Sequence, residues 1–192
     1  DVLKSISANG LKGEERVSYD LAKRNLEESI EESQFPQELM PIDHLNGLQS
    51  SLPDTVETMP RETLRDYENI LARLDKFPVV AEQVQTLLKE GLRQRVTALK
   101  MFMSRVPEQF DKILPTKIED SPIYLPFAKI GDGFSAAQKA DLQQRGREVI
   151  QSKVYPAMQK LKQFIITEYI PNARESISYS QMPNGKAWYA YL

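Results

Sequence analysis

The stretch SAAQKADLQQRGREVIQSKVYPAMQKLKQFIITEYIP, residues 135–171, decides the fold of this chain. Its apolar side chains recur at the spacing that places them on one face of an α-helix. Ser135 is a good N-cap for that helix, and Pro171 predicts its end. Pro156 falls inside it and predicts a local bend or break, at about 3 kcal/mol unless neighbouring groups replace the lost hydrogen bond. The apolar stripe is Leu142, Val149, Ile150, Val154, Met158, Leu161, Ile165 and Tyr169.

Residues 61–114 carry two further helical patterns and a short third one. Phe77-Pro78 separates the first two, because proline ends one helix and readily opens the next. So short a connection predicts a pair of antiparallel neighbours. Pro107 predicts the start of the third helix, and Pro115 its end. The apolar residues of the pair are Leu64, Tyr67, Ile70, Leu71 and Leu74, then Val80, Val84, Leu87, Leu88 and Leu92.

The remaining segments predict one more helix and several ordered, proline-rich connections. In residues 1–60, a helix begins near Glu14, and Pro36 to Pro60 form a packed connection with a short helical turn. Residues 115–134 are expected to form an extended segment pressed onto the core, with Tyr124 to Phe127 on the long helix. Residues 172–192 predict a turn and an aromatic helix. No strand-like alternation is present, so residues 1–192 are expected to form a single all-α region. The helix near Glu14 has the apolar residues Val17, Leu21, Leu26 and Ile30.

Composition excludes several functions. The 192 residues hold 25 Lys and Arg against 27 Asp and Glu, a net charge of −2, which argues against a nucleic-acid partner. The basic run from Lys89 to Arg105 is interpreted as a solvated helix face. With no cysteine and one histidine, disulfides, iron–sulfur clusters, a cysteine nucleophile and a zinc site of two or three imidazoles within one copy are excluded. No apolar run is long enough to span a membrane.

The end of the sequence holds the candidate binding residues. Met182-Pro183-Asn184-Gly185 predicts a tight turn that Asn184 caps for a helix beginning at Lys186. An aromatic ring can stack on a peptide, and a turn can donate backbone N–H groups. The candidate substrate-binding residues are Asn184, Gly185, Trp188 and Tyr189.

A purely structural role competes with binding at each of these positions. For Asn184 and Gly185, a turn and helix cap is the favoured interpretation, and Trp188 can be a core residue. Tyr189 and Tyr191 can either line a cleft or pack. The chain stops on Trp-Tyr-Ala-Tyr-Leu without the glycine or charged last turn of an ordinary helix end, so we expect the parent polypeptide to continue beyond Leu192.

Other polar residues have plainer interpretations. His44 stands alone in a proline-rich connection and is interpreted as a surface or hydrogen-bonded histidine. Arg174 and Glu175 are expected to form an ion pair at a helix end, with a clamp for a substrate carboxylate as the alternative. Glu168 and Glu175 are interpreted as solvated carboxylates and not as an acid/base pair. No catalytic and no metal-ligating residue is assigned.

The order and spacing of several motifs resemble the bacterial family called domain of unknown function 885. The resemblance covers essentially the whole chain and is most specific over residues 121–192. Its motifs are Phe35-Pro36, Pro41-Ile42-Asp43-x-x-Asn46-Gly47, Ser121-Pro122-Ile123-Tyr124-x-Pro126-Phe127, Val154-Tyr155-Pro156-Ala157-x-x-x-Leu161-x-x-Phe164, Glu168-Tyr169-Ile170-Pro171-x-Ala173-Arg174-x-Ser176 and Pro183-Asn184-Gly185-x-x-Trp188-Tyr189.

The resemblance implies that the chain is the N-terminal third of a longer protein. Family members resemble gluzincin-type zinc metallopeptidases, and many look like exported lipoproteins or periplasmic proteins. Their His-Glu-x-x-x-Gly-His-like element, with two imidazoles for the zinc and a glutamate as general base, lies far downstream of the matched motifs. Residues 1–192 are therefore expected to form a wall of the substrate cleft without a cofactor of their own. The alternative is a non-catalytic helical module that binds a peptide or a protein through Trp188, Tyr189 and Tyr191.

Overall fold

A computed structural model describes residues 2–192, and its regular elements are helices. Within that range there is no β-strand, and one isolated parallel bridge joins Leu99 to Arg174. The all-α prediction is therefore confirmed. None of the helices in residues 2–192 is long and apolar enough to cross a membrane.

The long helix runs from Ala136 to Asn172. It consists of α7 (Ala136–Val149), a π-helical turn (Ile150–Val154), α8 (Tyr155–Phe164), a second π-helical turn (Ile165–Tyr169) and α9 (Ile170–Asn172). Ser135 begins it with a capping box. Its hydroxyl accepts the N–H of Gln138 at 3.2 Å, and the Gln138 side chain accepts the N–H of Ser135 at 2.8 Å. The apolar stripe is buried as expected, at Leu142, Ile150, Val154, Met158, Leu161, Ile165 and Tyr169.

Pro156 does not break this helix, and the helix ends one residue after Pro171, close to the predicted end. Each follows a π-helical turn, at Ile150–Val154 and Ile165–Tyr169, in which the backbone bond spans five residues instead of four. The wider turn moves the carbonyl that a proline ring would meet, so the chain continues past both rings. Pro171 lies within α9, and the helix ends at Asn172.

A single helix, α3 (Leu64–Gln94), replaces the predicted antiparallel pair. The prediction was wrong because Pro78 lies inside the helix without ending it. A proline in a helix interior costs about 3 kcal/mol. Phe77 and Ala81 are buried on either side of it, and burying a large apolar side chain contributes about 1.5–3 kcal/mol, so packing offsets the lost bond.

The proline-rich connections are more helical than predicted. Residues 36–60 contain the three-turn helix α2 (Leu48–Thr58), with Pro53 inside it. Residues 115–134 are packed on the core as expected, but they form short helical turns instead of an extended segment, ending in α6 (Leu125–Ala128). Two further short helices are α4 (Lys100–Met103) and α5 (Val106–Ile113), the latter opened by Pro107 as predicted.

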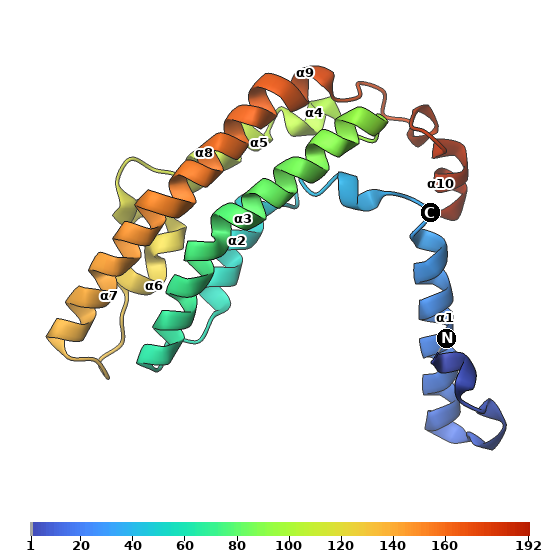
Figure 1. Ribbon diagram of the computed structural model, residues 1–192, viewed down its shortest axis with the longest axis horizontal. Coiled ribbons are helices and arrows are strands. Elements are labelled where there is room, and N and C mark those ends of the chain that lie inside the picture. The colour runs from blue at the N-terminus through green and yellow to red at the C-terminus, as the bar shows by residue number, and fades with distance from the viewer. Residues whose placement is uncertain (1) are drawn as a thin grey trace.

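The main core lies between α3 and the long helix. Figure 1 shows α3 and α7–α8 side by side and running in the same direction, with α2, α5 and α6 packed nearby. Gly146 of α7 allows α6 to approach closely, since a Cβ atom there would lie 2.5 Å from the Cγ of Phe127. Tyr124 and Phe127 are buried against the long helix, which confirms the predicted position of that aromatic segment.

The whole chain forms an arch (Figure 1). The α3–α7–α8 body is one side, and the helix α1 (Gly13–Glu32) projects on the other side with no buried residue. A second, smaller core joins the two sides. It packs α10 (Gly185–Tyr191) against the residues that follow α1, through Phe35, Leu39, Val96, Met182 and Trp188.

Candidate functional site

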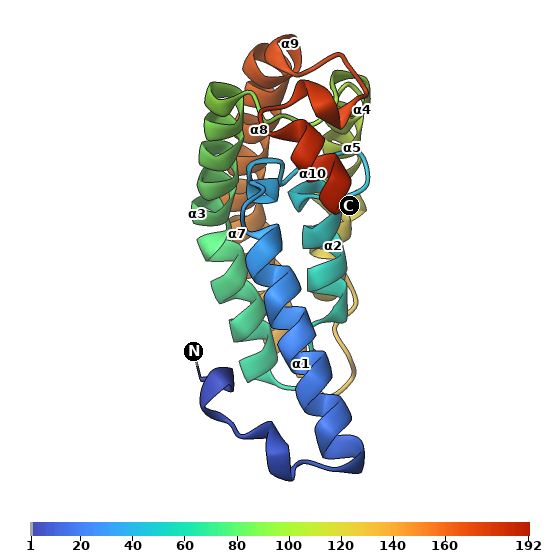
Figure 2. The ribbon, with the colours of Figure 1, turned by 90° about the vertical axis from the view of Figure 1, so that its right-hand side faces the viewer.

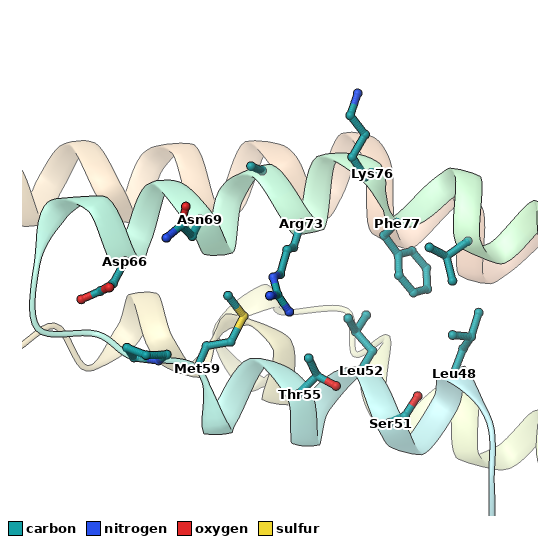
Figure 3. Close-up of a pocket in the computed structure, with 13 residues that line it drawn as sticks. Leu48, Ser51, Leu52, Thr55, Met59, Asp66, Asn69, Arg73, Lys76 and Phe77 are labelled. Carbon is teal, nitrogen blue, oxygen red and sulfur yellow. The ribbon is translucent and has the colours of Figure 1, made fainter. Parts of the chain in front are cut away.

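A groove lies between α2 and α3. It has a volume of about 720 Å³. Figure 3 shows Arg73 of α3 and Met59 from the end of α2 pointing into the space between the two helices, while Lys76 points away from it. The groove is therefore mainly apolar, and the Arg73 side chain places a positive charge in it. Its apolar walls are Leu48, Leu52, Met59, Phe77 and Val80, and its polar side chains include Ser51, Thr55, Asp66, Asn69, Arg73 and Lys76.

The body that carries this groove lies opposite α1. In Figure 1, α1 stands apart from α2 and α3, and in Figure 2, seen from the α1 side, α1 lies in front of them. A space separates α1 from α2 and α3. We call the sides of these three helices that border it the inner face. The inner face combines a groove with an uncovered helix.

The apolar residues of α1 are exposed. The exposed fractions are 58% for Val17, 55% for Leu21, 50% for Leu26 and 70% for Ile30. These residues also do not form one stripe. The five-residue step from Leu21 to Leu26 turns the helix by about 140°, so that the pairs Val17–Leu21 and Leu26–Ile30 lie on different sides of α1. A 20-residue helix of this kind leaves apolar surface uncovered on two sides.

The predicted binding residues of the tail have different environments. Asn184 has the positive φ of 56° that suits a turn, and it is the N-cap of α10, but its side chain makes no capping hydrogen bond. Gly185 is buried, and a Cβ there would lie 1.8 Å from the carbonyl oxygen of Tyr179. The backbone of the Tyr179 turn therefore leaves no room for a side chain at this position. Trp188 is fully buried and stacks on Phe35 with ring centroids 5.6 Å apart. The structure thus gives these three residues roles in packing and chain reversal.

Tyr189 lies at the surface, as Asn184 does, with 71% of its area exposed. It borders a groove of about 510 Å³ together with Ile177, Tyr179 and Lys186. Tyr191 packs on the smaller core, and its hydroxyl donates to the carbonyl oxygen of Glu28 at 3.2 Å. Trp188 and Tyr191 of α10 therefore pack between the two sides of the arch, while Tyr189 remains free to contact a ligand.

The other polar candidates are placed as follows. The His44 ring stacks on Phe102 with centroids 4.2 Å apart. Glu175 pairs with Lys100 at 2.9 Å, so the expected Arg174–Glu175 pair does not form. Glu168 and Glu175 are both exposed, as expected of solvated carboxylates. Among residues 2–192, no three His, Asp or Glu side chains gather closely enough to hold a metal ion.

The basic run from Lys89 to Arg105 does not form a patch of free cations. Arg93 pairs with Glu90, and Lys89 lies over the ring of Phe164 at 5.4 Å from its centroid. The pKa of Glu90 falls to about 2 because the Arg93 and Gln94 side chains donate to its carboxylate. The interpretation as a solvated helix face applies to Lys89 and Arg93, which are exposed on α3. The run as a whole is not one helix face, because Arg95 ends α3 and Lys100 belongs to α4.

Comparison with known proteins gives one family and one solved structure. A family model described as "Bacterial protein of unknown function (DUF885)" matches residues 1–192. The crystal structure of the putative lipoprotein from Colwellia psychrerythraea matches with a TM-score of 0.71 and 19% sequence identity. That match covers 78% of this chain and 26% of the Colwellia chain, and at this identity it shows a shared fold. A search of curated proteins gives no match.

The family match extends over all the motifs that carried the resemblance, and the structural match agrees with it in fold. By its sequence, the chain belongs to the DUF885 family of bacterial proteins.

Proposed function

We propose that residues 1–192 are the N-terminal helical part of a longer protein resembling zinc-dependent peptidases. In this proposal they form a wall of its substrate cleft and do not catalyse a reaction by themselves. The remainder of the parent polypeptide packs against the inner face. The observation that carries the proposal is α1, a 20-residue helix that buries none of its residues.

An uncovered α1 needs a partner for two physical reasons. Helices in proteins owe most of their stability to the tertiary packing of an apolar face. Exposed apolar clusters also mark surfaces that another chain segment covers. Because the pairs Val17–Leu21 and Leu26–Ile30 lie on different sides, a single flat partner surface reaches only one of them. A covalently continuous polypeptide that wraps around α1 reaches both.

The length of the structural relative supports this partner. The match covers 26% of the Colwellia chain, so most of that protein lies outside the part that this chain resembles. The residue inventory supports the non-catalytic role, since one histidine and no cysteine supply no second imidazole or thiolate. In this proposal, any zinc ligands of the parent lie beyond residue 192. The name of the relative and the lack of cysteine also favour export of the parent, which fractionation of cells into cytoplasm, periplasm and membrane tests.

Charged substitutions on α1 test the packing directly. Leu21→Glu and Ile30→Glu probe its two sides, and Ser18→Glu is the control, an exposed polar position on the same helix. In the 192-residue chain each variant is expected to change the free energy of unfolding by less than about 0.5 kcal/mol, because the side chains are exposed. In the longer parent, Leu21→Glu and Ile30→Glu are expected to cost about 2–3 kcal/mol each, since they remove a buried leucine or isoleucine.

Thermal unfolding of all four proteins in both lengths measures these values. If the parent tolerates Leu21→Glu and Ile30→Glu as well as Ser18→Glu, α1 is not covered and the proposal fails. A parent reading frame that stops at Leu192 also contradicts it.

A second candidate is a peptide-binding module, favoured by the exposed Tyr189 beside its groove. With Trp188 in the core, the aromatic surface expected for this module is reduced to Tyr189 and the edge of Tyr191. Loss of peptide binding in Tyr189→Ala, with binding retained in Lys112→Ala at an exposed position of α5 outside the groove, would favour this module over the wall.

A further inference from the structure

Arg174 is a half-buried guanidinium without an anionic partner. Among residues 2–192, no carboxylate lies within 4 Å of it, although the neighbouring Glu175 pairs with Lys100. Burial lowers the pKa of Arg174, but a guanidinium stays protonated in proteins, so the charge remains. Charges in such surroundings are normally paired. Arg174 therefore has an unmet requirement for an anion.

The protein fixes Arg174 in position. Its backbone N–H donates to the Thr97 hydroxyl at 2.9 Å, and its carbonyl accepts the N–H of Lys100 at 2.9 Å. Its Nε donates to the Thr97 carbonyl at 2.8 Å, and its Nη1 donates to the Ser176 carbonyl at 2.7 Å. The guanidinium also lies 5.5 Å from the centroid of the Tyr179 ring. Nη2 has no hydrogen-bond partner in the described part of the chain, so a preorganised cation retains free donors.

Arg174 lines a cavity of about 330 Å³, at the small end of the range for ligand pockets in proteins. The cavity lies where the segment after α9 passes α4 (Figure 1). Phe102, stacked with His44, supplies a flat wall, and Met40 and Leu99 supply aliphatic surface. A ligand of this size can place an apolar group on these walls.

Asp43 lines the same cavity and adds a negative charge. Burial raises the pKa of its carboxyl, but the backbone N–H groups of Leu45 and Asn46, at 2.6 and 2.8 Å from Oδ1, outweigh burial and leave the pKa below its usual value. Oδ2 accepts one long contact of 3.3 Å from the Asn46 side chain. The carboxylate is therefore ionised and can accept a further donor. It is not within ion-pair distance of Arg174, so the two opposite charges stand apart in one small cavity.

We propose that this cavity binds a small zwitterion of the α-amino-acid class with an apolar or aromatic side chain. The ligand carboxylate accepts from Arg174, its ammonium group donates to Asp43, and its side chain packs on Phe102. A plain dianion such as phosphate fits poorly, because Asp43 repels it. This site does not depend on the proposed function of the chain, since all its residues are within residues 1–192.

Calorimetric titration of the 192-residue chain with L-phenylalanine and L-leucine tests the site. Matched probes that lack one charge are 3-phenylpropanoate and 2-phenylethylamine, and inorganic phosphate is the anion control. We expect the amino acids to bind about ten- to a hundredfold more tightly than either one-charge analogue, which is the usual effect of losing a charge-assisted hydrogen bond. Arg174→Gln is expected to reduce the affinity for L-phenylalanine to that of 2-phenylethylamine.

Two further variants keep the test valid if Arg174→Gln disturbs the fold. Asp43→Asn retains the oxygen that accepts from Leu45 and Asn46, so it preserves the loop, and it is expected to reduce L-phenylalanine affinity to that of 3-phenylpropanoate. Arg73→Gln removes a cation from the separate α2–α3 groove and is expected to leave binding unchanged.

Three results would overturn the proposal. The first is that no probe binds at millimolar concentration. The second is that phosphate or 3-phenylpropanoate binds as tightly as the amino acids and Asp43→Asn has no effect, which would indicate a simple anion site. The third is that folded Arg174→Gln binds as the native chain does.

Discussion

Gly185→Ala is the substitution whose effect follows most directly from the packing of α10. A Cβ atom at position 185 would lie 1.8 Å from the carbonyl oxygen of Tyr179 and 2.7 Å from its carbonyl carbon. Both are backbone atoms, which cannot rotate away as a side chain does. Either the Tyr179–Gln181 turn or α10 must therefore move. Both are tied to the smaller core, through Met182 directly after the turn and Trp188 in α10.

The size of the effect comes from two opposing contributions. Overpacking in a core costs about 1–3 kcal/mol when side chains can adjust, and a backbone clash belongs at the upper end of that range. Replacing glycine by alanine inside a helix contributes about 1 kcal/mol in the other direction. Gly185→Ala is therefore expected to lower the free energy of unfolding by about 2 kcal/mol. Burial of Trp188 contributes about 4–6 kcal/mol, from roughly 150–250 Å² at about 25 cal/mol per Å². The substitution is thus expected to loosen α10 and leave the main core folded.

Fluorescence measures this change without a label, because Trp188 is the single tryptophan of the chain. In the native chain its ring is fully buried and its emission is expected at short wavelength. Gly185→Ala is expected to shift the emission to longer wavelength and to increase quenching by iodide, while the helical circular dichroism of the body is retained. Lys186→Ala, at the exposed next position, is the control. Native emission and native stability in Gly185→Ala would refute the close approach of α10 to Tyr179.

Two other predictions concern the body of the arch. Ser135→Ala removes the cap of the long helix and is expected to lower the free energy of unfolding by about 1 kcal/mol in urea denaturation, and an unchanged midpoint would show that the capping box contributes nothing. Burial raises the pKa of Tyr169 to about 12, above the value of about 10 for an exposed phenol, so the folded chain retains this proton and stability is expected to fall as the pH rises from about 10 to about 12. Ultraviolet titration of the native chain against Tyr169→Phe isolates this group, and ionisation near pH 10 would contradict its burial.

The main features of the body can be predicted from sequence because they depend on local chemistry. The stripe from Leu142 to Tyr169 has helical spacing, and Ser135 with Gln138 is a recognisable capping pair. The aromatic segment Tyr124–Phe127 is apolar enough to require burial. These signals act within one helix or one turn, and the structure agrees with each of them.

Proline is where local rules mislead. Pro78 was expected to divide one helix into an antiparallel pair, and Pro156 to bend or break another. In α3, buried neighbours on both sides of Pro78 offset the lost bond. In the long helix, a π-helical turn before Pro156 makes room for the ring. Neither compensation can be predicted from the proline itself, because each depends on tertiary packing or on a change of helical repeat.

The candidate site residues also divide into those that the sequence singles out and those that only the fold brings together. Trp188 and Gly185 stood out in sequence because of their residue types, and they turn out to be close-packed. The zwitterion cavity had no sequence signal as a whole, since Asp43, Phe102 and Arg174 come from three distant segments. A carboxylate clamp at Arg174 was an alternative from sequence, and Glu175 was the expected partner that the structure assigns to Lys100. Only the fold shows that Arg174 is left without an anion.

Amide hydrogen exchange of α1 measures whether the remainder of the parent polypeptide covers this helix. The 192-residue chain and the longer parent protein are labelled under the same conditions, and peptides from Gly13–Glu32 are compared with peptides from the buried helix α8. We expect α1 to exchange rapidly in the short chain and to be strongly protected in the parent, while α8 is protected in both. Equally rapid exchange of α1 in both proteins would contradict the claim that the remainder of the polypeptide covers the inner face.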